Sequence, residues 1–203
     1  MNQAIQTLME EHRVIEEVLG SLETFVDRMD AGEEVARDSI RDYADFFRNF
    51  ADRCHHGKEE DRLFALMGEN GFPSEYGPIA VMLAEHTEGR AHVKALFEAG
   101  EAPGLLAADD KLQVSRHARA YISLLRSHIV KEDNILYPMA LQAIRNEEME
   151  ALGEAFELFE REVMGEGTHA KYHALVRALV AAYPPDPAKM AAGAACAGCP
   201  GHV

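Results

Sequence analysis

Hydrophobic residues recur along most of this 203-residue chain at alternating steps of three and four, which is the spacing of one face of an α-helix. Residues 2–30 show the pattern clearly, with one face formed by Ile5, Leu8, Ile15, Leu19, Leu22, Val26 and Met29. Similar stretches cover about residues 35–68, 77–99, 106–144 and 147–182. Since no run of alternating β-branched residues competes with them, the sequence predicts an all-α protein.

Glycine and proline mark where these helices are expected to bend or end. Pro138 lies inside the fourth stretch, so that helix should kink or restart near Tyr137. The segment Gly165-Glu166-Gly167 could interrupt the fifth stretch. Residues 184–203 are rich in alanine, glycine and proline, and we expect a flexible tail there.

Polar residues occupy several positions of the hydrophobic face, and they repeat. His12 is followed 43 residues later by His55-x-x-x-Glu59, and His86 is followed 42 residues later by His128-x-x-x-Glu132. Each single histidine also follows a glutamate. A repeated His, then His-x-x-x-Glu, is what two helical hairpins need to hold two metal ions between them.

The residue types of this repeat favour metal binding over a plain core. Residues four apart share one face of a helix, so each His-x-x-x-Glu directs both side chains at one ion. A buried glutamate without a partner is costly, and two cations would remove that cost. At about 100° per residue, His55 lies nearer the apolar face than His56. The sequence therefore predicts His55 and Glu59 as ligands, with His56 and Glu60 as the second choice.

These residues give the chain a resemblance to the hemerythrin-like family, also called HHE cation-binding domains, over about residues 1–145. The matching positions are His12, His55-His56-x-Lys58-Glu59-Glu60-x-x-Leu63-Phe64, Glu85-His86 and His128-Ile129-x-Lys131-Glu132-Asp133-x-x-Leu136-Tyr137-Pro138. The resemblance implies an up-down-up-down four-helix bundle around two non-haem iron ions with an oxo or hydroxo bridge. It implies that the ligands are His12, His55, His86 and His128, with Glu59 and Glu132 as bridging carboxylates.

Imidazole and carboxylate ligands also suit zinc or manganese, which we expect less than iron. Under this interpretation residues 1–145 form the bundle, residues 146–183 form an additional helix packed on it, and residues 184–203 form the tail. Any one of these six residues, taken alone, could be a hydrogen-bonded core residue or a surface residue. The duplicated pattern argues against this alternative for all six together.

One position departs from the oxygen-carrying members of the family, which have a second histidine one turn after the third-helix histidine. Arg90 stands there in this chain. Of the roughly twelve coordination positions of two octahedral irons, four histidines, two bridging carboxylates and an oxo or hydroxo bridge leave about two open, which favours exchangeable small ligands over oxygen storage. Arg90 could steer an anion, pair with a carboxylate such as Glu60, or extend from the core face to the surface.

Three functions remain open at this point. The first is binding or sensing of oxygen, nitric oxide or peroxide in redox stress, with output through a protein electron donor or signalling partner. The second is an enzyme that reduces peroxide or nitric oxide, or an iron donor for the repair of damaged iron cofactors. The third is a metal-free or zinc-containing structural bundle.

Composition narrows the partners and the location. The 35 acidic and 20 basic residues give a net charge of −15, which argues against nucleic acid and anionic membranes. There is no membrane-spanning run and no signal peptide, so we expect a cytoplasmic protein. Three cysteines make no disulfide framework.

Weaker signals lie outside the repeat. Cys196-x-x-Cys199 in the tail could bind zinc or act as a dithiol, and His169 with His173 could bind metal, although a structural role is favoured for that pair. Lys58 and Lys131 are interpreted mainly as surface charge. Further side chains near the repeat are assigned to the core or placed too far from the site: Cys54, Tyr121 and His117.

Overall fold

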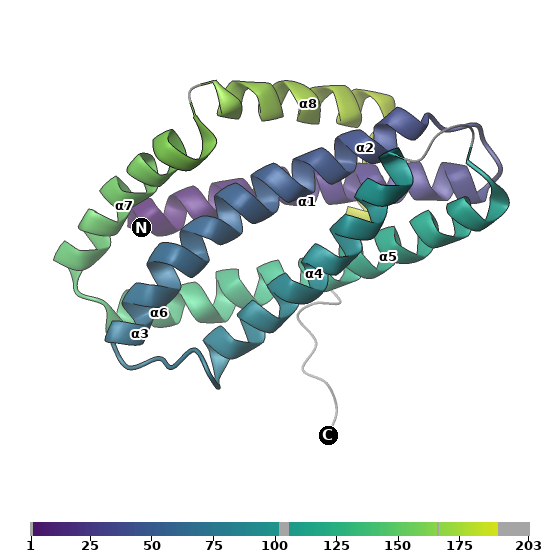
Figure 1. Ribbon diagram of the computed structural model, residues 1–203. Coiled ribbons are helices and arrows are strands. Elements are labelled where there is room, and N and C mark those ends of the chain that lie inside the picture. The colour runs from purple at the N-terminus through teal and green to yellow at the C-terminus, as the bar shows by residue number, and fades with distance from the viewer. Residues whose placement is uncertain (1, 102–105, 166, 191–203) are drawn as a thin grey trace.

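The computed structural model describes residues 2–101, 106–165 and 167–190, and every regular element in these ranges is a helix (Figure 1). The prediction of an all-α protein is confirmed. Four π-helical segments, named η, interrupt or extend the α-helices. The elements are α1 Gln3–Asp30, α2 Arg37–Phe46, η1 Phe47–His56, η2 Glu59–Leu63, α3 Phe64–Glu69, α4 Pro78–Glu101, α5 Ala108–Lys131, η3 Glu132–Leu136, α6 Tyr137–Ala143, α7 Asn146–Phe159, η4 Glu160–Met164 and α8 Thr168–Ala182.

Four long helical runs lie alongside one another: α1, the run from α2 to α3, α4, and the run from α5 to α6 (Figure 1). The helix α4 packs against both α2 and α5, and α1 packs against α5. The side chain of Asn2 begins the first run by accepting a 2.9 Å hydrogen bond from the Ala4 backbone nitrogen. None of the helices in the described ranges combines the length and hydropathy needed to cross a membrane.

The fourth run changes at Pro138, as its sequence predicts. The α-helix ends at Lys131, a π-helical turn covers Glu132–Leu136, and α6 begins at Tyr137. Pro138 therefore lies in the first turn of α6, directly after the π-helical turn, so the change in backbone hydrogen bonding falls where one N–H donor is absent.

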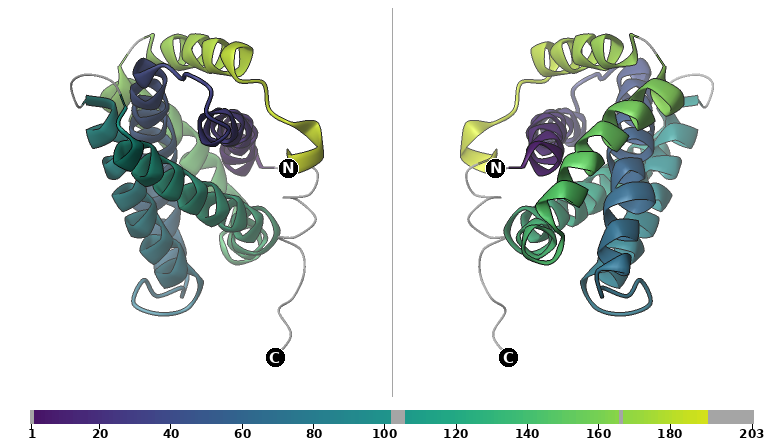
Figure 2. Two further views of the ribbon diagram at one scale, coloured as in Figure 1. Left: turned by 90° about the vertical axis from the view of Figure 1, so that its right-hand side faces the viewer. Right: turned by 90° about the vertical axis from the view of Figure 1, so that its left-hand side faces the viewer.

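The fifth stretch, residues 147–182, is interrupted at the two glycines where its sequence allowed a break. It forms two helices, α7 and α8, that run in different directions (Figure 2). Gly165 and Gly167 cause the break, because their φ angles of 79° and 81° are left-handed and glycine adopts them without steric cost. Helix α7 packs on α1, and α8 packs on both α1 and α2.

Two apolar clusters form the core, and a polar layer separates them. On α1, Leu8 belongs to one cluster and Ile15 to the other, with His12 between them. On α4, His86 lies in the same way between Met82 and Val93. All of these side chains are buried. The core therefore places the repeated histidines in a layer from which the apolar clusters exclude water on both sides.

Candidate metal centre

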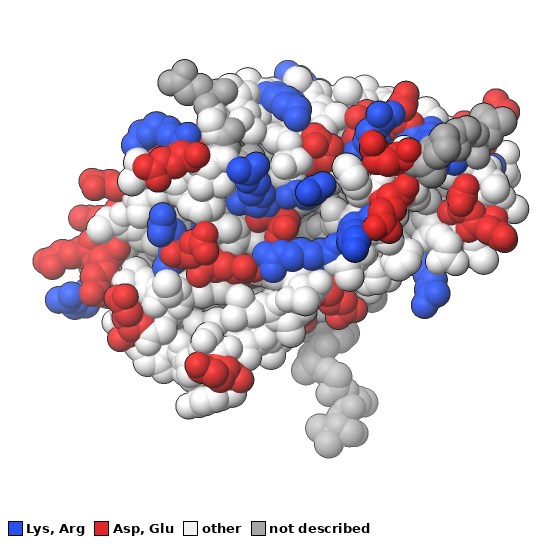
Figure 3. Space-filling view, viewed as in Figure 1, with Lys and Arg blue, Asp and Glu red and all other residues white. Residues whose placement is uncertain are grey.

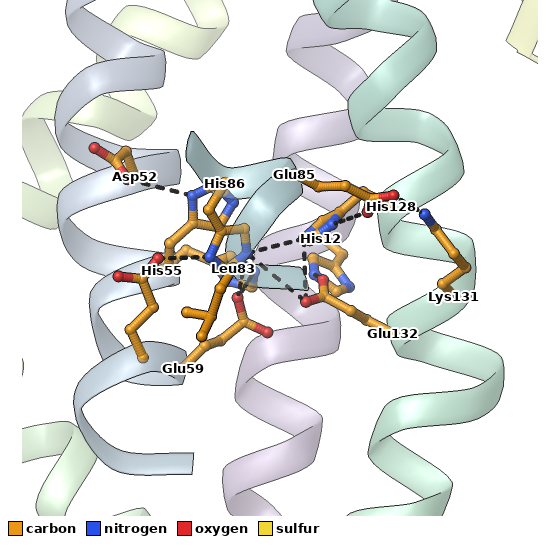
Figure 4. Close-up of polar contacts among 12 residues, drawn as sticks. His12, Asp52, His55, Glu59, Leu83, Glu85, His86, His128, Lys131 and Glu132 are labelled. Atoms are coloured by element: carbon orange, nitrogen blue, oxygen red, sulfur yellow. Dashed lines mark hydrogen bonds and ion pairs between the residues drawn. The ribbon is translucent and has the colours of Figure 1, made fainter. Parts of the chain in front are cut away.

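Two groups of buried side chains in the polar layer each offer four ligand atoms that lie within 4.8 Å of one another. The first ligand group is His12, His55, Glu59 and Glu132. The second ligand group is His56, Glu59, His86 and His128. Figure 4 shows the histidines and glutamates of the repeat directed at a common centre from four helical runs. The structure thus brings together all six residues of the repeat and adds His56.

The two glutamates lie between the groups. One Glu59 oxygen is 3.6 Å from both His55 Nε2 and His86 Nε2. The oxygens of Glu132 lie 3.2 Å from His12 Nε2 and 3.1 Å from His128 Nε2. Each carboxylate therefore faces histidines of both groups, which is the arrangement that a bridging carboxylate needs.

Both glutamates start a π-helical turn. The backbone nitrogen of Phe64 donates to the Glu59 carbonyl, and that of Tyr137 donates to the Glu132 carbonyl, five residues earlier in each case. A π-helical turn holds more residues than an α-helical turn and often occurs at functional sites. The two halves of the repeat are thus matched in backbone as well as in sequence.

His56 lies in the centre rather than outside it. Its side chain is 3% exposed, and its ring stacks on His86 with centroids 3.8 Å apart. The preference for His55 over His56 assumed 100° per residue, but both lie in the π-helical segment η1, where successive side chains are separated by a smaller angle. His55 and His56 therefore both face the centre.

A carboxylate holds the outer nitrogen of each repeated histidine. The Nδ1 atoms of His12, His55, His86 and His128 lie 2.7, 2.9, 2.6 and 2.8 Å from Asp133, Glu11, Glu60 and Glu85, respectively. An ionised carboxylate only accepts hydrogen bonds, so each imidazole donates its Nδ1–H and turns its Nε2 towards the centre, where a bound cation would take the Nε2 lone pair. Glu60, the second-choice ligand, is one of these supporting carboxylates and belongs to neither ligand group.

Basic side chains in turn bind these carboxylates. Lys58 binds Glu11, and Lys131 binds Glu85. Lys58 is fully buried and also lies 2.6 Å from Glu160, so its interpretation as a surface charge is wrong. Lys131 is about one-third exposed. In the sequence each lysine directly precedes a ligand glutamate, Glu59 or Glu132. The carboxylates that the lysines bind lie on other helices, so the sequence alone does not show these ion pairs.

Arg90 binds two carboxylates at the outer side of the centre. Its guanidinium lies 2.7 Å from Glu60 and 2.8 Å from Asp52, and its side chain is 40% exposed. Of the alternatives for this position, pairing with Glu60 is observed. Arg90 thus supports the carboxylate that orients His86.

Tyr137 is a site residue that the sequence analysis missed. Its hydroxyl donates a 2.8 Å hydrogen bond to Glu59 and lies 3.3 Å from His12 Nε2. The other half of the repeat has Phe64 at the matching position, with its ring stacked near His86. The difference between Phe64 and Tyr137 at matching positions was the sequence feature that could have identified Tyr137 as a site residue.

The electrostatics of the centre fit cations. Burial raises the pKa of Glu59 well above its usual value, and the nearby Glu132 carboxylate raises it further. Burial also opposes ionisation of Glu132, but His128 and His12 lower its pKa well below the usual value. Positive charge between the carboxylates would allow both to ionise.

Unsatisfied atoms support the same conclusion. Among the described residues, Nε2 of His55 and His56, one oxygen of Glu59 and both of Glu132 are buried without a hydrogen bond. The Nε2 atoms of His86 and His128 face each other at 3.0 Å, although both Nδ1 atoms are held by carboxylates. Bound cations would satisfy these lone pairs, so the donor set fits metal.

Other candidate residues lie elsewhere or outside the description. His117 pairs with His92, with their Nδ1 atoms 3.0 Å apart, and belongs to neither ligand group. Tyr121 and Cys54 are buried in the protein. His173 is exposed, whereas the His169 side chain and the Cys196/Cys199 motif lie outside the described residues.

Comparison with known proteins agrees with this geometry. Residues 3–140 match the family model described as the hemerythrin HHE cation binding domain. Uncharacterized proteins of Mycobacterium bovis and Mycobacterium tuberculosis are 23% identical over 163 residues, which is 80% of this chain and 63% of theirs. The chain thus spans less than two-thirds of their length, and no solved structure matches it significantly. Since the family model covers more than half of the chain, this protein belongs to the hemerythrin HHE cation-binding family.

Proposed function

We propose that this protein holds two iron ions and uses them to bind or sense oxygen, nitric oxide or peroxide. The first ligand group would hold one ion and the second ligand group the other, with Glu59 and Glu132 facing both. The observation that carries the proposal is the convergence of buried, unsatisfied imidazole and carboxylate atoms within 4.8 Å. Zinc and manganese are the less favoured occupants of the same donor set.

When bound, iron supplies a one-electron redox change and coordination positions for a small ligand. The protein's own residues orient the donors and exclude water. The carboxylates on Nδ1 fix each imidazole, and the apolar clusters close the layer on both sides. If His56 ligates, it fills one of the positions that the four-histidine set left open. The donor set then contains five histidines, with the fifth supplied by η1 rather than α4.

A second candidate function is enzymatic reduction of peroxide or nitric oxide, and Tyr137 favours it. Its hydroxyl proton is held 2.8 Å from Glu59 inside the buried centre, where it could be donated to a reduced ligand. Steady turnover with an external reductant that falls in Tyr137→Phe would support this function. Binding without turnover would leave sensing as the role. We also propose that the protein acts together with a protein electron donor or signalling partner, and that it is located in the cytoplasm.

Metal analysis of freshly purified protein tests the proposal. We expect about two irons per chain and an absorption spectrum that changes when oxygen, peroxide or nitric oxide is added to the anaerobic ferrous protein. His86→Ala should lower the iron content, whereas His117→Ala, outside both ligand groups, should not. Purified protein that lacks iron and does not take it up would contradict the proposal.

A further inference from the structure

A cavity of about 480 Å³ lies between η1 and α4, beside the second ligand group. Lysine and arginine side chains gather across the middle of the face that these two segments share (Figure 3). One wall of the cavity is His56, a member of the second ligand group. The cavity is therefore a separate space that extends from the centre towards the surface.

The size of the cavity exceeds what a diatomic ligand needs. A water molecule takes about 30 Å³ of liquid, and sites for organic ligands measure roughly 300–1,000 Å³. The cavity of about 480 Å³ lies in the range of the organic sites. Oxygen or nitric oxide would leave most of this space to water.

Part of the cavity wall is apolar. Val93, Phe97 and Tyr121 contribute side chains, and Gly89 contributes backbone without a side chain. A Cβ added at Gly89 would lie 3.3 Å from the Tyr121 ring, so the glycine allows this ring to lie against α4. An apolar body of a ligand would replace water along these walls.

The charges around the cavity favour an anion. Arg48, Arg90 and Lys94 line it together with Asp52 and Glu98, which sums to a local charge of +1 in a chain of −15. Arg90 binds Asp52 at 2.8 Å, and Lys94 lies 3.8 Å from Glu98.

Arg48 has a different environment. It is exposed, and its guanidinium lies 5.2 Å from the centroid of the Phe97 ring. This cation therefore lies beside an aromatic wall, at the edge of the cavity, where it can bind a carboxylate through two parallel hydrogen bonds.

We propose that this cavity binds a small amphiphilic organic anion, an aromatic or short-chain carboxylate. The carboxylate binds Arg48, and the apolar body lies against Val93, Phe97 and Tyr121, next to His56. Binding of this anion is a function additional to the proposed binding of a diatomic ligand or peroxide at the metal centre. It does not require coordination of the anion to metal.

Isothermal titration calorimetry with 3-phenylpropanoate on the purified full chain tests this site. Arg48→Gln should weaken binding about tenfold, since it removes a charge-assisted contact. Arg116→Gln, an equal charge change at an exposed position that does not line the cavity, should leave the affinity unchanged. Val93→Phe, which fills the cavity, should abolish binding, and circular dichroism should show that it is folded.

Two further probes separate this site from its alternatives. The neutral alcohol 3-phenylpropan-1-ol should bind at least tenfold more weakly, and formate should not compete. Equal affinity for the alcohol, competition by formate, or no effect of Arg48→Gln would overturn the proposal, because the anion would then be held by apolar walls alone or by the metal. Iron content measured on the same samples reports separately on the proposed function.

Discussion

Replacement of Lys58 by methionine is expected to destabilise the protein far more than the matching replacement of Lys131. The Nζ atom of Lys58 is fully buried and binds Glu11 and Glu160, and Glu11 is only 5% exposed. Removing the ammonium leaves the Glu11 carboxylate buried with only its hydrogen bond from His55. Breaking a buried ion pair on one side costs about 3–5 kcal/mol.

Lys131 provides the matched control, because it binds Glu85 in the other half of the repeat but is about one-third exposed. Pairs that water can screen contribute roughly 0–1 kcal/mol. The two variants should therefore differ by about 2–5 kcal/mol in free energy of unfolding. Urea unfolding of the metal-saturated proteins at pH 7, followed by circular dichroism, measures this difference. Equal losses in the two variants would refute the assignment of Lys58 to the buried support of His55.

Further outcomes follow from Gly57, Gly68, Cys54 and Tyr137. Gly57→Ala should cost about 1–3 kcal/mol of unfolding free energy, because its Cβ would lie 2.7 Å from the Phe159 ring, whereas Gly68→Ala, with open space around it, should gain about 0.5–1 kcal/mol. Thermal unfolding of both variants tests whether the first lowers and the second raises the stability. Burial raises the pKa of Cys54 from 9.0 to about 12, so this thiol should resist iodoacetamide at pH 9 in the native protein and react after unfolding, as peptide mass spectrometry can show. Since the folded state keeps this proton longer than the unfolded state, the contribution of Cys54 to stability is present below pH 9 and is lost as the pH rises towards 12. Tyr137→Phe should cost about 1–3 kcal/mol in urea unfolding, since a buried carboxylate loses its hydroxyl donor, and an unchanged midpoint would contradict that hydrogen bond.

The periodicity of the sequence predicts the helices and the repeated ligand positions because both depend on local spacing. His12 and His86 stand at α-helical steps from their hydrophobic neighbours, so the face they share is evident from the chain alone. His56 could not be placed in this way, because a π-helical segment changes the angle between successive side chains while the hydrophobic spacing around it stays helical.

The buried ion pair of Glu11 and Lys58 was missed for a different reason. Glu11 and Lys58 are 47 residues apart, and only the packing of α1 against η1 brings them together. A lysine on a helix looks like a surface residue until its buried partner is known. The break of the fifth stretch was marked by Gly165 and Gly167, but the sequence did not show that both would adopt left-handed backbone angles.

The central claim is that each of the two ligand groups holds one cation. Anomalous diffraction at the iron edge, from crystals grown anaerobically with ferrous salt, tests it most directly. The account predicts two iron peaks about 3.5–4 Å apart, one beside His12 and His55 and the other beside His56, His86 and His128. A single peak outside the polar layer, or imidazoles that turn away from one another with no peak between them, would contradict the account.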